Sequence, residues 1–358
     1  MVSSMFSNTY KGKRILITGD TGFKGSWLVF WLQRLGAEVF GLSLKPPSTL
    51  YHSNLLDLDY PKYTCNLSDI HETCRVVKKV KPDTIFHLAA QSLVRKSYQN
   101  PYETFQTNIM GTASLLEAVR ECDSVKTIIV ATSDKCYHNT ETGEPFKEDD
   151  PLGGHDPYSA SKGAVEIVAQ SYRSSFLNNQ GVLLSTVRAG NVIGGGDWGA
   201  DRLLPDLMKS ASQSKTLVIR SPNAVRPWQH VLEPLSGYLL VGERLYLGDE
   251  TSATAWNFGP TEEGHFTVEE LIATAHDCWQ KVKYSTEKNT YHEATLLKLS
   301  CKKAEDYLQW QPIWEGTEAI VKSVEWYRSY YEKNEILTEY HFDEFVQSAK
   351  ENGAVWVN

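Results

Sequence analysis

The chain has 358 residues, of which 41% are hydrophobic and 22% charged, and its formal net charge is −8. This composition is typical of a globular enzyme with a sizeable core, and the negative charge argues against nucleic acid as a partner. No apolar run is long enough to cross a bilayer, and the first ten residues lack the apolar stretch of a signal peptide. We therefore expect no membrane partner. The six cysteines show neither close pairing nor metal-ligand spacing, so we expect free thiols, a cytoplasmic location and no metal.

The first predicted element is a strand over residues 13–18, which a glycine-rich loop follows directly. Three glycines, each three residues apart, allow a tight turn, the approach of backbone amides to a pyrophosphate and close packing of the next helix. Apolar residues at helical spacing predict that helix between positions 28 and 35. A strand before the loop and a helix after it favour dinucleotide binding. The predicted cofactor contacts are Gly19, Thr21, Gly22, Phe23 and Gly25.

A second strand is predicted over residues 38–44, and no acidic side chain stands at its end. Sites that prefer NAD usually have Asp or Glu there, which binds the adenosine ribose hydroxyls. The chain continues instead through Ser43 and Lys45, and a lysine suits a 2′-phosphate. This strand alone therefore leaves open whether the cofactor is NAD or NADP.

Helices and strands alternate through the following residues, which predicts a parallel, doubly wound sheet. One short strand ends near the adenine side of the expected site, and the strand over residues 84–88 is followed by side chains small enough to admit a cofactor. Asn108 falls on a later helix, either as a binding residue or as a structural residue that holds the active-site backbone. The cofactor contacts predicted from the strand ends are Asn66, Leu67, Leu88, Ala89 and Ala90.

The segment over residues 131–162 carries the strongest indication of catalysis. It begins at the end of an apolar strand, and the carboxyl ends of strands are where open α/β sheets bind ligands. Tyr158 and Lys162 stand four residues apart, on one face of the helix that follows. A phenol acts as a base near neutrality only if its anion is stabilised, and an amine one turn away supplies positive charge. The polar side chains directly after the strand are Thr132, Ser133, Asp134 and Lys135.

After a strand over residues 182–187, a glycine-rich stretch indicates irregular backbone and a crossing into a second lobe. Arginines flanked by prolines and an aromatic residue follow, and they suit a diphosphate and a stacked base. Any one of them, taken singly, is equally well explained as an exposed arginine on a loop. The predicted substrate contacts are Arg188, Asn191, Arg202, Arg220 and Arg226.

We therefore expect an α/β fold, with a Rossmann-like doubly wound parallel sheet and a smaller, discontinuous α/β lobe. The large domain would comprise residues 1–190 and about 228–260 and would bind the dinucleotide. The smaller lobe would comprise residues 191–227 and about 261–345 and would bind the substrate.

Taken together, these motifs resemble the extended short-chain dehydrogenase/reductase family over most of the chain. The resemblance rests on the glycine loop, the hydroxyls at Thr132 and Ser133 and the pair formed by Tyr158 and Lys162. Epimerases and dehydratases of that family act on nucleotide sugars. The resemblance implies NAD as cofactor, a nucleotide-sugar substrate and a homodimer formed through helices of the large domain.

Ser133, Asp134 and Lys135 align with the Thr-Asp-Glu triplet of the family's sugar-nucleotide 4,6-dehydratases. Lys135 departs from that pattern, because most such dehydratases have a glutamate base there. The Asp-Lys pair and residues 223–230 look like the branch that dehydrates CDP-D-glucose. That branch serves CDP-dideoxyhexose synthesis for O-antigen, part of the lipopolysaccharide of bacterial surfaces.

The resemblance implies a reaction in which Tyr158, assisted by Lys162, takes the proton of the sugar C4 hydroxyl while hydride passes to the nicotinamide. Thr132 or Ser133 is expected to hydrogen-bond the C4 oxygen. The C4 ketone acidifies the C5 proton, a base removes it, and an acid protonates the C6 hydroxyl, which leaves as water. The same hydride then returns to C6.

Asp134 is the predicted acid and needs a raised pKa, whereas Lys135 is the predicted base and needs a lowered one. Alternatively, Lys135 only orients water or Asp134. A nucleotide-sugar 4-epimerase shares the fold and the Tyr-Lys pair, but it needs no acid and base for water loss. A 4-reductase or another NADP-dependent dehydrogenase fits the missing acid after the second strand. A non-catalytic dinucleotide-sensing regulator has no need of the whole constellation.

Overall fold

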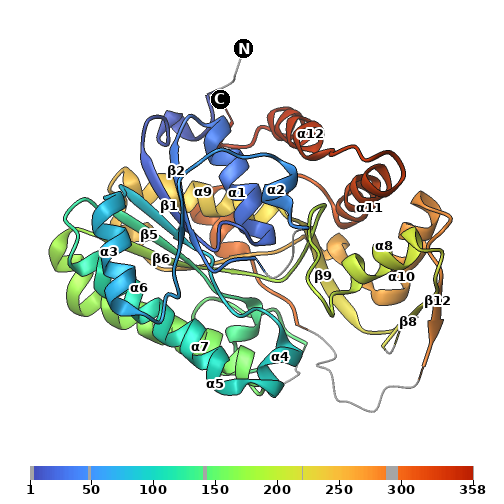
Figure 1. The fold of residues 1–358 in the computed structure, drawn as a ribbon, viewed down its shortest axis with the longest axis horizontal. Helices are drawn as coiled ribbons and strands as arrows, with labels where there is room; N and C mark the ends of the chain where they lie inside the picture. The colour runs from blue at the N-terminus through green and yellow to red at the C-terminus, as the bar shows by residue number, and fades with distance from the viewer. Residues whose placement is uncertain (1–3, 47–49, 140–142, 220, 288–296, 358) are drawn as a thin grey trace.

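The computed structural model describes residues 4–46, 50–139, 143–219, 221–287 and 297–357. Its centre is a sheet of seven parallel strands in the order β10-β6-β5-β4-β1-β2-β3 (Figure 1). The chain enters at β1 and winds outward in both directions, so the predicted doubly wound fold is confirmed. The strands of this sheet are β1 (Arg14–Thr18), β2 (Glu38–Ser43), β3 (Lys62–Thr64), β4 (Thr84–His87), β5 (Thr127–Ala131), β6 (Leu183–Ala189) and β10 (Ala255–Phe258).

Helices cover both faces of the sheet, which explains why the central strands β4 and β5 are buried along nearly their whole length. Helices α3, α6 and α7 cover one face, and α1, α9 and α12 cover the other. The helices of this large unit are α1 (Phe23–Arg34), α2 (His52–Leu55), α3 (Ile70–Val80), α4 (Val94–Gln99), α5 (Pro101–Phe105), α6 (Gly111–Arg120), α7 (Pro157–Tyr172), α9 (Leu232–Tyr246) and α12 (Thr338–Glu351).

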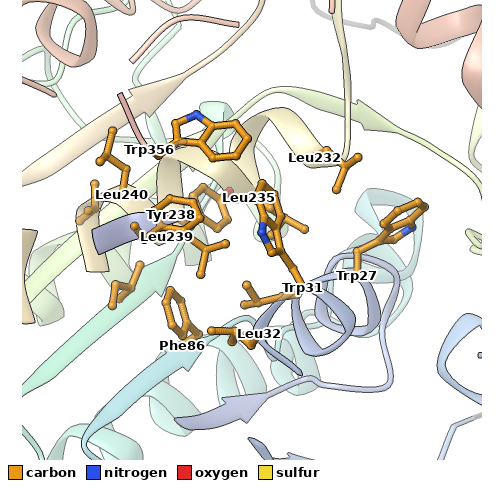
Figure 2. Close-up of a cluster of buried hydrophobic side chains, with 14 of the residues drawn as sticks. Trp27, Trp31, Leu32, Phe86, Leu232, Leu235, Tyr238, Leu239, Leu240 and Trp356 are labelled. Carbon is orange, nitrogen blue, oxygen red and sulfur yellow. The ribbon is translucent and has the colours of Figure 1, made fainter. Parts of the chain in front are cut away.

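The cluster on the second of these faces is rich in aromatic side chains. Figure 2 shows Trp31 of α1 near Leu235 and Tyr238 of α9, with Trp356 and Trp27 toward opposite sides of the cluster. The ring centroids of Trp31 and Trp356 lie 5.4 Å apart at an interplanar angle of 67°, an edge-on arrangement that aromatic pairs favour. The C-terminal part of the chain therefore completes the core of the large unit.

A smaller unit lies beyond the carboxyl end of the sheet and has its own buried apolar cluster (Figure 1). It contains one three-stranded and one two-stranded sheet. Its elements are β7 (Asn191–Ile193), α8 (Leu203–Ser212), β8 (Leu217–Ile219), β9 (Val225–His230), β11 (His265–Thr267), α10 (Val268–Cys278), β12 (Tyr284–Thr286) and α11 (Gly316–Lys333). The short 3-10 and π helices of the chain are η1 (Phe6–Asn8), η2 (Gln106–Met110), η3 (Asp134–Cys136), η4 (Arg173–Leu177), η5 (Asn178–Gln180), η6 (Glu250–Ser252), η7 (Glu262–Gly264) and η8 (Ala304–Leu308). Among the described helices, none has the length and apolar character needed to span a membrane.

Glu233 connects α9 to the segment that leads into α11. Its side chain is fully buried, and its carboxylate accepts hydrogen bonds from the backbone N–H groups of Ile313 (3.0 Å) and Trp314 (2.7 Å). Burial raises the pKa of Glu233 to about 8, although these two hydrogen bonds lower it. Because the folded-state pKa lies above the ordinary value of 4.5, the contribution of this carboxyl to stability is full below that value and is lost as the pH rises through about 8.

We expect the melting temperature of the wild-type protein to fall as the pH rises from about 5 to about 8, and Glu233→Gln to remove part of this fall. Melting curves across this pH range, recorded by circular dichroism, measure the effect. Glu250→Gln changes an exposed glutamate and serves as the control. An equal pH dependence in Glu233→Gln and in the wild type would assign the fall to other groups.

Candidate active site

Tyr158 and Lys162 lie in the first two turns of α7, which packs against the end of β5. The helix begins where Asp156 accepts a hydrogen bond from the backbone N–H of Ser159 (3.0 Å), with a proline in the first position. The Lys162 ammonium donates to the carbonyl oxygen of Ala131 at 3.0 Å, which joins α7 to the last residue of β5. Tyr158 and Lys162 are both buried.

Ser133 is the hydroxyl that completes the set with Tyr158 and Lys162. Its side chain hydrogen-bonds the Tyr158 phenol and also donates to Asp134 Oδ1 at 2.8 Å. Asp134 is buried, and Lys135 follows it in η3 with a half-buried side chain. The structure therefore brings these five predicted catalytic residues together at one strand end.

Burial dominates the electrostatic environment of Tyr158 and Lys162. Burial raises the pKa of Tyr158 to about 12, while the Ser133 hydrogen bond lowers it. Burial also lowers the pKa of Lys162 to about 8, although the nearby Glu166 raises it. Desolvation of the phenol outweighs the charges of the protein around it, and the stabilisation of the tyrosinate by Lys162 together with the nicotinamide charge stays a prediction.

Thr132 is also placed differently from the expectation. Its hydroxyl donates to Glu166 Oε1, on the buried side of α7, and lies 3.4 Å from the carbonyl oxygen of Val187. Glu166 stands one helical turn beyond Lys162 and also accepts from the Thr186 hydroxyl at 2.6 Å. The structure thus directs the Thr132 side chain into the core and leaves Ser133 as the hydroxyl beside Tyr158.

Arg188 requires a second correction, because its guanidinium does not face a ligand. It donates to both carboxylate oxygens of Glu166 at 2.9 Å, and its side chain is only 3% exposed. Its remaining nitrogen donates to the Tyr137 hydroxyl (2.7 Å) and to the Glu148 carbonyl oxygen (2.9 Å). An arginine held in this way is not available to a substrate diphosphate.

Three of the other predicted substrate contacts lie where the smaller unit begins or within its strands. Arg202 pairs with Asp197 at 2.6 Å and donates to the Ser92 hydroxyl at 3.0 Å, and its charge interacts with Tyr158. Asn191 and Arg226 lie on the neighbouring strands β7 and β9. Arg220 lies outside the described residues.

The glycine loop is built against the end of β4. Gly19 has φ +74°, and a Cβ there would lie 2.8 Å from the backbone of Ala89. A Cβ on Gly25 would lie 2.1 Å from the Gly19 carbonyl oxygen. A side chain at either position would collide with the backbone, so the tight turn requires glycine there. The loop therefore fits the predicted role of bringing backbone amides close to a pyrophosphate.

The remaining predicted cofactor contacts differ in exposure. Asn66 is exposed, whereas the Leu67 side chain is buried in the core, so only the backbone of Leu67 is placed to meet a ligand. The half-buried residues are Thr21, Phe23, Leu88, Ala89 and Ala90, and Gly22 is exposed.

Asn108 has the structural role that was one of its two expected alternatives. Its side-chain amide donates to the Gln91 carbonyl oxygen (3.1 Å) and to the Ser161 hydroxyl (2.8 Å), and its oxygen accepts from the Gln91 N–H (2.8 Å). It therefore joins the segment after β4 to the catalytic helix α7.

Lys24 and Tyr238 are site residues that the sequence analysis missed. Burial lowers the pKa of Lys24 to about 8, and Lys162 and Arg202 lower it further, whereas Asp134 raises it. The Lys24 ammonium lies 6.0 Å from the centre of the Tyr238 ring. A lysine inside a glycine loop was a detectable sequence signal, whereas an aromatic residue in an apolar helix was not.

The described residues contain no group of three His, Cys, Asp or Glu side chains arranged to hold a metal ion. All six cysteines are free thiols.

The sequence model of the GDP-mannose 4,6 dehydratase family matches residues 16–323. The chain belongs to the GDP-mannose 4,6-dehydratase family. The chain is 43% identical to a CDP-glucose 4,6-dehydratase of Salmonella typhimurium. The match extends over 339 residues, which cover 92% of this chain and 94% of the relative. The predicted resemblance to sugar-nucleotide dehydratases is therefore confirmed.

Two solved structures of other proteins have the same fold as this chain. The epimerase Mth375 of Methanothermobacter thermautotrophicus superposes with a TM-score of 0.80 at 25% identity, covering 93% of this chain and 96% of that one. DesIV, a dTDP-glucose 4,6-dehydratase of Streptomyces venezuelae solved with NAD bound, superposes with a TM-score of 0.76 at 24% identity, covering 88% and 98%. The likeness to DesIV shows the common fold.

Proposed function

We propose that this protein is a hydro-lyase that converts CDP-D-glucose to CDP-4-keto-6-deoxy-D-glucose, with NAD regenerated in each turnover. The observation that carries the proposal is the set of Ser133, Tyr158 and Lys162 beside an acid and an amine, Asp134 and Lys135. The 43% identity to a CDP-glucose 4,6-dehydratase over nearly the whole chain supports the choice of sugar nucleotide.

NAD would lie over the glycine loop, at the carboxyl ends of β1 and β4. The loop backbone from Gly19 to Gly25 would hold the pyrophosphate, and Tyr158 and Lys162 would face the nicotinamide end. When bound, NAD accepts a hydride from the sugar and returns it. The chain's own residues then have only proton transfers and binding to perform.

Each proton transfer has a candidate residue in the site. Tyr158, which Ser133 hydrogen-bonds, takes the proton of the C4 hydroxyl. Asp134, buried beside Ser133, delivers a proton to the C6 hydroxyl as it leaves. Lys135 removes the C5 proton. Arg202, Asn191 and Arg226 are the proposed contacts of the substrate diphosphate.

Dehydration in deuterated water tests this function. The purified protein is incubated with CDP-glucose and NAD, and the product is analysed by mass spectrometry and NMR. We expect loss of one water and deuterium at C5 only, because the hydride that reaches C6 comes from C4. Conversion to the galacto isomer at unchanged mass would make the protein an epimerase and would remove Asp134 and Lys135 from their proposed roles.

Lys135→Met is expected to lower the rate of C5 proton exchange by about 10²-fold or more, because general base catalysis contributes that much. Reduction of NAD by the substrate should persist, since that step needs only Ser133, Tyr158 and Lys162. Exchange is measured by NMR, and reduction by the absorbance of the nicotinamide. Lys147→Met replaces an exposed lysine on the loop that follows and serves as the control. An unchanged exchange rate would leave Lys135 with the alternative role of orienting water or Asp134.

We also propose that the protein is a homodimer that pairs through α5 and α7. Large apolar side chains are exposed on this surface of the large unit, among them Tyr102 (78%) and Ile167 (59%). Tyr102→Glu combined with Ile167→Glu is expected to convert dimers to monomers, because each subunit would bury two unpaired carboxylates at the interface. Sedimentation velocity measures the change, and Leu247→Glu, on an exposed apolar residue after α9, is the control. A wild-type protein that sediments as a monomer would contradict the proposal.

The cellular role that we propose is the supply of CDP-dideoxyhexoses for the O-antigen of bacterial lipopolysaccharide, in the cytoplasm. A 4-keto-6-deoxy sugar is reactive at the positions next to its ketone, so it suits further deoxygenation. Six free thiols are consistent with a reducing compartment.

A further inference from the structure

Strand β2 ends at Ser43 without an acid, but an acid from another segment lies beside that end. Asp20, the second residue of the glycine loop, is 1% exposed, and its side chain extends under β2. A Cβ on Gly41 would lie 2.2 Å from Asp20 Oδ2 and 2.8 Å from a ring carbon of Tyr60. The strand thus has a glycine at the position where the carboxylate needs room.

The Asp20 carboxylate has two hydroxyl neighbours: the buried Tyr60 and the half-buried Ser43. The Tyr60 hydroxyl donates to Oδ2 at 2.9 Å, and the Ser43 hydroxyl also hydrogen-bonds the carboxylate. Burial raises the pKa of Asp20, while these two hydrogen bonds lower it. Oδ1 is buried and has no hydrogen-bond partner among the described residues. Ser43 Oγ lies 3.2 Å from the Thr21 hydroxyl, and both of these side chains are half-buried.

We propose that Asp20 supplies, from the glycine loop, the negative charge that β2 lacks, and that it selects NAD over NADP through Ser43. The proposal rests on the proposed use of a nicotinamide dinucleotide. In nucleotide-binding sheets of this type, the end of the second strand meets the adenosine ribose. A specificity-determining residue at this end acts on binding and leaves the chemistry of the sugar unchanged.

The physical argument concerns the direction of the hydrogen bonds. Ser43 lies between the Asp20 carboxylate and the Thr21 hydroxyl. Because a carboxylate only accepts, our proposal has Ser43 donate its proton to Asp20, and the Ser43 oxygen then accepts from the cofactor. A ribose hydroxyl can donate to that oxygen, whereas a 2′-phosphate carries no suitable proton and is repelled by the buried charge. Lys45 is exposed and forms no hydrogen bond or ion pair within the described part of the chain, so its charge is largely screened.

The test compares the affinities of purified wild-type protein and variants for NAD and NADP, measured by calorimetry. Asp20→Asn is expected to lower the ratio of NAD affinity to NADP affinity by about tenfold, the usual effect of losing one hydrogen bond to a charged group. Ser43→Ala keeps the charge and is expected to weaken NAD binding by several-fold. Asp59→Asn removes an exposed acid from the segment that also carries Tyr60, and it should leave the ratio unchanged.

An unchanged ratio in both Asp20→Asn and Ser43→Ala would overturn the inference. A shift in Lys45→Ala without one in Asp20→Asn would also overturn it, since Lys45 would then set the selectivity. If these results occurred while the wild type still dehydrated CDP-glucose, the proposed function would stand. If the wild type bound neither dinucleotide, both proposals would fail.

Discussion

Tyr158→Phe is expected to lower kcat for CDP-glucose by between about 10²- and 10⁴-fold, the range that general acid–base groups contribute. The variant loses one oxygen, while the buried ring and the position of α7 are retained. Because both the C5 proton transfer and water loss follow oxidation at C4, exchange at C5 should fall by the same factor as product formation.

Steady-state kinetics and the exchange measurement together test this expectation. Tyr172→Phe is the matched control, because Tyr172 lies on the same helix and its hydroxyl donates to Glu117 (2.7 Å) on the outer surface. If Tyr158→Phe kept the wild-type rate, another group would have to accept the C4 hydroxyl proton. The nearby Lys24 amine would then be the first candidate, because its pKa is lowered to about 8.

Arg188→Met is expected to lower the free energy of unfolding by about 3–5 kcal/mol, because it leaves the buried Glu166 carboxylate without its charged partner. Both side chains are at most 4% exposed, and two parallel hydrogen bonds join them. The loss should extend to activity, since Glu166 also holds Thr132 next to the catalytic Ser133.

Urea denaturation measures the change in stability. Arg75→Met breaks an exposed pair with Glu72 and serves as the control, because it should change the free energy of unfolding far less than Arg188→Met does. The double variant Glu166→Leu and Arg188→Met removes both charges and is expected to recover part of the lost stability. A loss below about 1 kcal/mol in Arg188→Met would show that the pair carries little net stabilisation.

The fold was predictable because each level of the sequence favoured the same arrangement. Apolar strands, a glycine loop at β1 and helices at regular intervals all specify a doubly wound parallel sheet. The grouping of Ser133 and Asp134 with Tyr158 and Lys162 followed from the rule that ligands meet the carboxyl ends of strands.

The directions of individual side chains were not predictable in the same way. Thr132 and Ser133 are neighbours with similar chemistry, and only the folded chain shows which hydroxyl faces Tyr158. Arg188 stands in β6 beside residues that suit a diphosphate, and its partner Glu166 is distant in sequence but adjacent in space. One pattern was available: Glu166 follows Lys162 by four residues, as Lys162 follows Tyr158, so all three share one face of α7.

The position of β10 at the edge of the central sheet has a consequence for how the chain acquires its structure. This strand pairs with β6, yet the first part of the smaller unit, from β7 to β9, is synthesised between the two. A growing chain that has passed β6 still lacks both its edge strand and the helix α9 that covers one face of the sheet. Because such distant contacts close slowly, the exposed edge of β6 is the part of the nascent protein most in need of protection from aggregation.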